Sequence, residues 1–150
     1  KETLLYLSMD DGHLTEYQVL MRKQIVIDRA DEHDIQEDTQ GRRVPLTLGQ
    51  ASIQCRHCKH KPFRQRGKGS VYYPTSLDRL YQTCQNMSNI HLRKTCTCID
   101  QETRQQLNVL CSIRGRATEG KQYWADGGKA LGLHESRGAL YWRSDEKDRP

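Results

Sequence analysis

The sequence predicts a small α+β domain, and three observations lead to that class. Short strand-like segments alternate with helix-like segments along the whole chain. Hydrophobic residues make up only 35% of the 150 residues, with a single Phe and a mean hydropathy of −0.90. A chain of this length and polarity has little apolar area for a core, and small domains of this kind are often stabilised by a bound metal. Two closely spaced pairs of metal-ligand residues, Cys55-x2-Cys58 and His91-x4-Cys96, could supply it.

Residues 1–51 are expected to form an acidic, partly helical N-terminal part of one domain that covers residues 1–150. Residues 3–8 are expected to form a short strand or a docking segment. Apolar side chains then recur with the i, i+3, i+7 spacing of an amphipathic helix, which predicts a helix over 13–29 with an acidic N-cap. The positions concerned are Leu14, Tyr17, Met21 and Ile25, and the acidic residues are Asp10 and Asp11.

The next segments are predicted to be a loop and a weak strand. Residues 31–43 are polar and acidic, which is typical of a loop. Residues 44–53 alternate only weakly and contain Pro45 and Gly49, so we expect an edge strand that leads into the first Cys pair.

Residues 52–98 form the predicted core of the metal module. A basic, Gly-containing loop over 62–69 precedes a strand over 70–73, which Pro74 ends. Thr75 or Ser76 is able to cap the helix that follows, which is expected to end near residue 92. The apolar side of this helix also carries His91, so its imidazole is expected to point inward. The inward apolar positions are Leu77, Leu80, Tyr81, Cys84 and Met87.

The C-terminal part, residues 99–143, is expected to be mainly helical. Asp100 is placed to cap a helix that continues to about Ile113. A second helix is expected to contain Tyr123 and Trp124 and to end near Gly132, although two adjacent glycines make it a poor helix. A final strand is predicted over 139–143, followed by a disordered tail over 144–150.

Cys55, Cys58, His91 and Cys96 are the predicted ligands of one metal ion. Tetrahedral Zn²⁺ is typically bound by Cys sulfur and His nitrogen, and a Cys-x2-Cys pair can fill two adjacent corners. Six cysteines would also allow three disulfides, but the close spacing and the nearby His favour metal in a reducing compartment. Cys98 remains an alternative to Cys96. His57 and His60 lie beside the Cys pair, where the geometry is awkward, and Cys84 and Cys111 fit small buried side chains.

The order of strand, Cys pair, strand, helix, His and Cys resembles the ββα zinc fingers of the CCHC type, and more loosely the BED-type fingers of chromatin and transposase proteins. This resemblance covers about residues 52–98. It implies that Cys55, Cys58, His91 and Cys96 ligate zinc. One departure is the 32-residue separation between Cys58 and His91, which is longer than usual and implies an enlarged loop around 59–70.

The predicted role of the zinc is structural, and we expect no enzyme activity. A catalytic zinc usually keeps one position for water, whereas four protein ligands close the coordination shell. The sequence also lacks the zinc deaminase pattern, a nucleophile elbow, a P-loop and a His-Glu-x-x-His helix.

Positive charge is concentrated on the metal module. Residues 55–94 hold nine Lys or Arg and only one acidic residue, whereas residues 1–54 hold six and ten, and residues 95–150 hold nine and eight. A focused positive field attracts polyanions. The alternative interpretation is an ordinary solvated basic loop.

A nucleic-acid-binding role is the function that these features favour. Lys and Arg side chains of the loop are expected to contact phosphates, while Asn and Gln on the helix can pair with adenine, which favours DNA over RNA. The alternative for the amides is a solvated helix surface. The predicted nucleic-acid-binding residues are Lys59, Lys61, Arg64, Arg66, Lys68, Gln82, Gln85, Asn86 and Asn89.

The competing hypothesis is a protein-interaction module with a structural zinc, such as a reader of histone tails or peptides. In that case the acidic N-terminal part would contact basic partners, and four C-terminal aromatic residues would form a groove or, alternatively, a small core. They are Tyr123, Trp124, Tyr141 and Trp142. A nuclear protein connected with chromatin or transposons is expected, with no membrane segment. Because the chain begins at Lys1, we expect a fragment of a longer protein.

Overall fold

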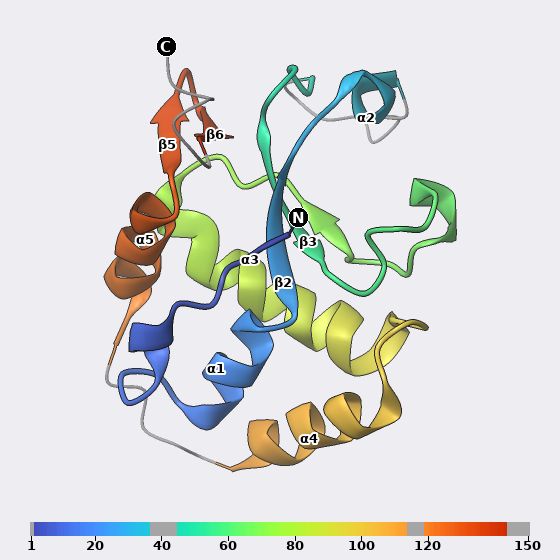
Figure 1. Ribbon diagram of the computed structural model, residues 1–150, viewed down its shortest axis with the longest axis vertical. Coiled ribbons are helices and arrows are strands. Elements are labelled where there is room, and N and C mark those ends of the chain that lie inside the picture. The colour runs from blue at the N-terminus through green and yellow to red at the C-terminus, as the bar shows by residue number, and fades with distance from the viewer. Residues whose placement is uncertain (1, 37–44, 114–118, 144–150) are drawn as a thin grey trace.

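The computed structural model describes residues 2–36, 45–113 and 119–143, and it has the α+β class that the sequence predicts. A four-stranded antiparallel sheet has the order β1-β2-β3-β4, and a separate hairpin pairs β5 with β6. Figure 1 shows helix α3 crossing behind β2, with α1 and α4 below and α5 beside it. The strands are β1 (Thr3–Leu4), β2 (Ile25–Arg29), β3 (Ala51–Cys55), β4 (Val71–Tyr72), β5 (Leu133–Ser136) and β6 (Ala139–Trp142).

Helical segments surround the sheet. The α-helices are α1 (Glu16–Arg22), α2 (Glu32–Gln36), α3 (Leu80–Asn86), α4 (Gln101–Ser112) and α5 (Lys121–Ala130). Three short 3-10 turns are η1 (Ser8–Asp10), η2 (Phe63–Gln65) and η3 (Leu77–Arg79), and a π-helical segment, η4 (Met87–Thr95), continues α3.

The long helix expected over 13–29 is wrong in its second half. The helix α1 ends at Arg22, and β2 follows from Ile25. Ile25, Val26 and Ile27 are consecutive β-branched residues, and all three are buried. Such a run fits a strand with both faces covered better than a helix, where β-branched side chains lose rotamer freedom. Ile25 matches the helical spacing only by coincidence.

The acidic cap predicted for this helix is also wrong. The side chain of Thr15 accepts a hydrogen bond from the Gln18 amide, and the Gln18 side chain accepts one from the Thr15 amide, each at 3.1 Å. This reciprocal pair is a capping box. Asp10 is instead fully buried, and Asp11 accepts a hydrogen bond from the Tyr6 hydroxyl.

Two further predictions around the first Cys pair need correction. Part of the loop predicted over 31–43 is the short helix α2, which begins where Asp31 and Asp34 bond each other's backbone amides. The edge strand predicted over 44–53 is the internal strand β3, paired with β2 on one side and β4 on the other. Every residue of β3 is buried. Residues 37–44 lie outside the described part of the chain.

The helix predicted to end near residue 92 is present as the continuous run η3, α3 and η4. Ser76 is its N-cap residue but makes no side-chain capping bond. The Leu77 amide instead donates to the carboxylate of Glu135 in β5, at 2.8 Å. A residue far along the chain therefore caps this helix, and no local motif could have indicated it.

The C-terminal helices follow the predictions more closely. Asp100 caps α4, with its carboxylate 2.9 Å from the Thr103 amide. The helix α5 ends at Ala130, and β6 occupies most of the predicted final strand. The strand β5 is not among the predicted elements. Its turn into β6 places Arg137 and Gly138 at positive φ, as a two-residue I′ hairpin turn requires. The tail over 144–150 lies outside the described residues.

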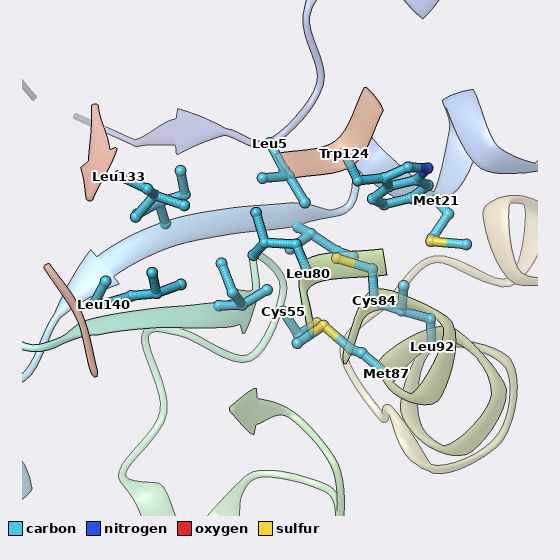
Figure 2. Packing of buried hydrophobic residues seen from close by; sticks show 14 of the residues in the cluster. Leu5, Met21, Cys55, Leu80, Cys84, Met87, Leu92, Trp124, Leu133 and Leu140 are labelled. Atoms are coloured by element: carbon cyan, nitrogen blue, oxygen red, sulfur yellow. The ribbon is translucent and has the colours of Figure 1, made fainter. Parts of the chain in front are cut away.

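The core lies between the sheet and the run from α3 to η4 (Figure 2). Figure 2 shows Cys55 and Met87 meeting in this layer, with Leu80 and Cys84 beside them. The candidate metal site is therefore continuous with the hydrophobic core. None of the helices in the described ranges is long and apolar enough to span a bilayer.

Candidate metal centre

The first half of the site comes from the end of β3. Cys55 is the last residue of the strand, and its amide donates to the Ser70 carbonyl oxygen at 2.9 Å. The chain then turns tightly, so that Cys58 returns to the same side with its side chain almost fully buried. Strand pairing fixes the first thiol, and the turn positions the second beside it.

The second half comes from η4. The Cys96 amide donates to the His91 carbonyl oxygen at 2.8 Å, which is an i to i+5 bond. This wider π-type turn ends the helix at Cys96, where the backbone becomes extended. π-helical turns are rare and occur frequently at functional sites. Here the turn brings Cys96 to the same point as His91.

Three of the six distances between the four ligand atoms match the edges of a coordination tetrahedron around zinc. Cys55 Sγ lies 3.8 Å from Cys96 Sγ, Cys58 Sγ lies 3.5 Å from Cys96 Sγ, and Cys58 Sγ lies 3.4 Å from His91 Nε2. Zn–S bonds of about 2.3 Å and Zn–N bonds of about 2.0 Å imply S···S edges of about 3.8 Å and S···N edges of about 3.5 Å. All four atoms lie within 4.8 Å of one another. The site is therefore compatible with a single structural zinc ion.

Disulfide pairing does not account for these distances. A disulfide bond is about 2.05 Å long. The sulfur atoms at the site are farther apart than that, and all six cysteines are free thiols.

The hydrogen bonds of His91 fix its ligating nitrogen. Its Nδ1 atom lies 3.1 Å from the carbonyl oxygen of Lys68, which can only accept a hydrogen bond. Nδ1 therefore carries the proton, and Nε2 presents its lone pair to the thiols. The Thr95 hydroxyl donates to the same carbonyl oxygen at 2.8 Å. Such outer hydrogen bonds orient metal-binding histidines in known sites.

Electrostatics within the cluster favour one thiolate among three thiols when no cation neutralises them. The hydrogen bond from Cys55, together with bonds from two backbone amides, lowers the pKa of Cys96 to about 3. The same hydrogen bond to Cys96 raises the pKa of Cys55, and burial raises that of Cys58 to about 11. A divalent cation at the centre would allow all three thiols to ionise, because metal binding displaces their protons.

The loop between the two halves presses directly on the site. A Cβ atom on Gly67 would lie 2.6 Å from the Thr95 carbonyl oxygen and 3.0 Å from the His91 ring. Only glycine fits there without movement of the backbone. Nothing in the sequence distinguishes this glycine from an ordinary loop residue.

The competing ligands are not part of the group of four ligand atoms that lie within 4.8 Å of one another. Cys98 is only partly buried, and its sulfur lies 3.9 Å from the Thr97 hydroxyl. His57 pairs with the Gln24 side chain at 2.8 Å, and His60 is exposed. Cys84 is fully buried in the core, as expected, whereas Cys111 is only partly buried.

The five predicted phosphate-contacting residues differ in their surroundings. Arg66 is used internally, since it donates to the carbonyl oxygens of Lys59 and Lys61 and to the Gln54 side chain. Lys59 forms an ion pair with Asp28 at 3.3 Å, and Lys61 donates to the Thr97 hydroxyl. The side chains of Arg64 and Lys68 are exposed.

The amide residues form one stripe along α3 and η4, but they are partly bonded to each other. Gln82 donates to Asn86 at 3.0 Å, and Gln85 donates to the Tyr81 hydroxyl. Asn89 accepts a hydrogen bond from Arg93, which also reaches Asn108 in α4. Gln82 and Asn89 are exposed, whereas Gln85 and Asn86 are half-buried.

A groove of about 810 Å³ lies beside the metal centre. The segment from the basic loop through β4 forms one wall, and the helical run contributes Arg79, Thr83 and Ile90 to the other. Arg79 is not among the predicted binding residues. It precedes Gln82 by three residues, so helical spacing could have placed it beside the amide stripe.

The four C-terminal aromatic residues take part in packing. Trp124 and Trp142 are buried, and the Trp142 indole donates to the Leu131 carbonyl oxygen at 2.9 Å. The Tyr123 hydroxyl donates to Asp10, and Tyr141 pairs with the Thr47 hydroxyl. Trp124 and Trp142 belong to the main hydrophobic core rather than to a separate C-terminal core.

Comparisons of this chain with protein-family models, with curated proteins and with solved structures find no match. Its function is therefore inferred from its own residues.

Proposed function

We propose that this chain is a nucleic-acid-binding module of the CCHC zinc-finger kind, with DNA favoured over RNA, in a nuclear protein connected with chromatin or transposons. Its role is binding rather than catalysis. The zinc site holds a cationic surface in place. The observation that carries the proposal is the placement of the exposed cations Arg64, Lys68 and Arg79 along one groove beside the Cys and His cluster.

Charge is the first support for this proposal. The groove residues include four Lys or Arg and no Asp or Glu. Nucleic-acid backbones are the most common polyanions that such a surface meets, and each neutralised phosphate releases counterions. The DNA preference rests on the amide stripe beside the groove, because Asn and Gln can read adenine edges in the major groove.

The coupling between metal and surface is the second support. The Lys68 carbonyl oxygen accepts hydrogen bonds from both His91 and Thr95, so the metal centre holds the loop that carries the cations. A structural zinc in this position would order the binding surface as well as the core.

Salt-dependent binding tests this function. Fluorescence anisotropy with labelled DNA and RNA at about 50 to about 200 mM salt should give affinities that fall steeply with salt. The triple variant Arg64→Gln, Lys68→Gln, Arg79→Gln should bind all sequences more weakly. Its slope of log K against log salt should be flatter by about 0.9 for each lost phosphate contact with duplex DNA.

A control variant removes the same charge elsewhere. Lys121, Lys129 and Arg137 are exposed, and they lie in α5 and at the β5–β6 turn, far from the basic loop in Figure 1. Changing these three residues to Gln should leave the slope unchanged. Equal effects of the two triple variants, or no binding by the parent protein at low salt, would contradict the proposed function.

A further inference from the structure

The groove beside the metal centre combines cations with exposed apolar surface. Phe63 is the only Phe in the chain. It lies in the short turn η2, and 37% of its surface is exposed. Ile90 is 38% exposed on the opposite wall. Exposed apolar residues that gather in one hollow are typical of binding sites.

Aromatic rings line the same hollow. Tyr72 lies in β4 and Tyr73 follows it directly, and both are half-buried residues of the groove wall. Tyr72 and Ile90 both pack against Gly69. A Cβ atom added to Gly69 would lie 3.0 Å from the Tyr72 hydroxyl oxygen and 3.0 Å from the Ile90 side chain. The positive φ of Gly69 lets the loop bend around this ring.

Phosphate contacts alone do not explain such a lining. A duplex keeps the flat faces of its bases stacked inside, so aromatic side chains gain nothing from a regular double helix. Unpaired bases expose those faces, and a positively charged groove with aromatic platforms is the usual arrangement for single strands. Stacking on an aromatic ring also tolerates any base sequence.

We propose that this groove binds unpaired nucleotides of a single-stranded nucleic acid, with bases stacked on Phe63 and Tyr72 and phosphates next to Arg64, Lys68 and Arg79. This inference rests on the proposed nucleic-acid binding and specifies an unpaired strand as the ligand of the groove, whereas base readout in a duplex would be a separate contact of the amide stripe. The volume of about 810 Å³ lies within the range of about 300–1,000 Å³ that is usual for small-ligand sites, so it suits a few nucleotide units.

The cations on the two walls support a bound strand rather than a loop that merely attracts anions. Arg79 belongs to η3, whereas Arg64 and Lys68 belong to the basic loop. A backbone that follows the groove would pass between them. Arg66 contributes by holding the loop, because its guanidinium bonds the carbonyl oxygens of Lys59 and Lys61.

The test uses one oligonucleotide sequence in three forms: single-stranded DNA, single-stranded RNA and duplex DNA. Each carries 2-aminopurine, whose fluorescence falls when it stacks. The zinc-loaded protein should bind a single strand more tightly than the duplex and quench the probe. Tighter binding of the DNA or the RNA strand supports the inference and identifies which of the two is preferred.

Phe63 provides the deciding variants because its exposure makes substitutions tolerable for the fold. Phe63→Leu keeps apolar bulk but removes the ring, and it should weaken single-strand binding about fivefold or more, the fold-change equivalent of about 1 kcal/mol for one stacked base. Phe63→Trp keeps a ring and should retain both affinity and quenching. Duplex binding should be the same in both variants. Zinc content and circular dichroism should match the parent protein.

The results separate failure of this inference from failure of the proposed function. Equal affinity for single strands and duplex, with Phe63→Leu and Phe63→Trp alike, would overturn the inference and leave nucleic-acid binding intact. No binding of any oligonucleotide would overturn both. Binding of polyglutamate in place of oligonucleotides would also overturn both, and would identify an acidic peptide as the ligand.

Discussion

His91 donates its Nδ1 proton to the carbonyl oxygen of Lys68, 3.1 Å away, and so connects the candidate metal centre to the wall of the groove. The imidazole therefore has two roles, because Nε2 faces the thiols while Nδ1 holds the loop. Loss of the metal would free the ring to rotate and release the Lys68 carbonyl. Metal binding and the shape of the cationic surface are expected to change together.

The first prediction concerns the metal itself. Cys55→Ser should abolish stoichiometric zinc and loosen residues 52–98, because ligand loss removes both the metal and its contribution to folding. Cys111→Ser is the matched control, since this thiol is partly exposed and lies outside the cluster. Metal analysis by mass spectrometry and thermal unfolding should separate the two variants. One zinc per chain in the Cys55→Ser protein would contradict the ligand assignment.

The second prediction concerns the loop that contacts His91. Gly67→Ala should weaken zinc affinity and lower the melting temperature, because the new Cβ atom would lie 2.6 Å from the Thr95 carbonyl oxygen. Gly120→Ala is the control, as its Cβ atom would meet nothing within 4 Å. Competition with a chelator measures the zinc affinity of both proteins. If both variants keep the parent affinity, the loop does not support the metal centre.

The sequence allowed the cluster of Cys and His residues to be predicted because the information is local. Two residues separate Cys55 from Cys58, and His91 and Cys96 lie at the end of one helix. Spacing alone therefore indicates each pair. Spacing does not distinguish Cys96 from Cys98. The π-type turn does, because it brings Cys96 close to His91. No local sequence pattern indicates such a turn.

The predictions of the fold were wrong where tertiary contacts determine the structure. Ile25 continues a helical row of apolar residues, yet its strand is held by pairing with Cys55 and by burial on both faces. The groove was missed because Arg79 and Phe63 are 16 positions apart and come to line the same groove only after β4 pairs with β3. Asp10 looked like a cap and is instead buried against Arg22.

The third prediction concerns that buried pair. The Arg22 guanidinium lies 2.7 Å from the Asp10 carboxylate, and both side chains are fully buried. Asp10→Asn would leave the Arg22 charge without its counterion, and removal of one partner from a buried pair typically costs about 3–5 kcal/mol. Tyr123→Phe loses only one hydrogen bond to this carboxylate, so about 1.5–3 kcal/mol is expected.

Urea unfolding of the zinc-loaded proteins measures both losses. The free energy of unfolding should fall more in Asp10→Asn than in Tyr123→Phe, while zinc content stays at the parent level in both. An Asp10→Asn protein as stable as the parent would show that the pair contributes little to the fold.

The fourth prediction concerns base recognition by the amide stripe. Asn86→Ala should not reduce fold stability, since alanine favours helices at least as much as asparagine. If this amide reads a base, its removal should cost about 1–3 kcal/mol on a preferred sequence selected from a random pool. Binding to random sequences should barely change, because phosphate contacts carry no sequence information.

Gln82 makes this prediction sharper, because its side chain donates to Asn86 at 3.0 Å and can hold that amide in one orientation. Gln82→Ala should therefore lose part of the same discrimination, and the double variant should lose less than the sum of the two single changes. Anisotropy titrations of the parent protein, the two single variants and the double variant on the preferred and random sequences complete a double-mutant cycle. Equal losses on both kinds of sequence would assign the stripe to backbone binding, and no loss on either would make it ordinary solvated surface. Strictly additive losses would show that the two amides act independently, each with its own contact.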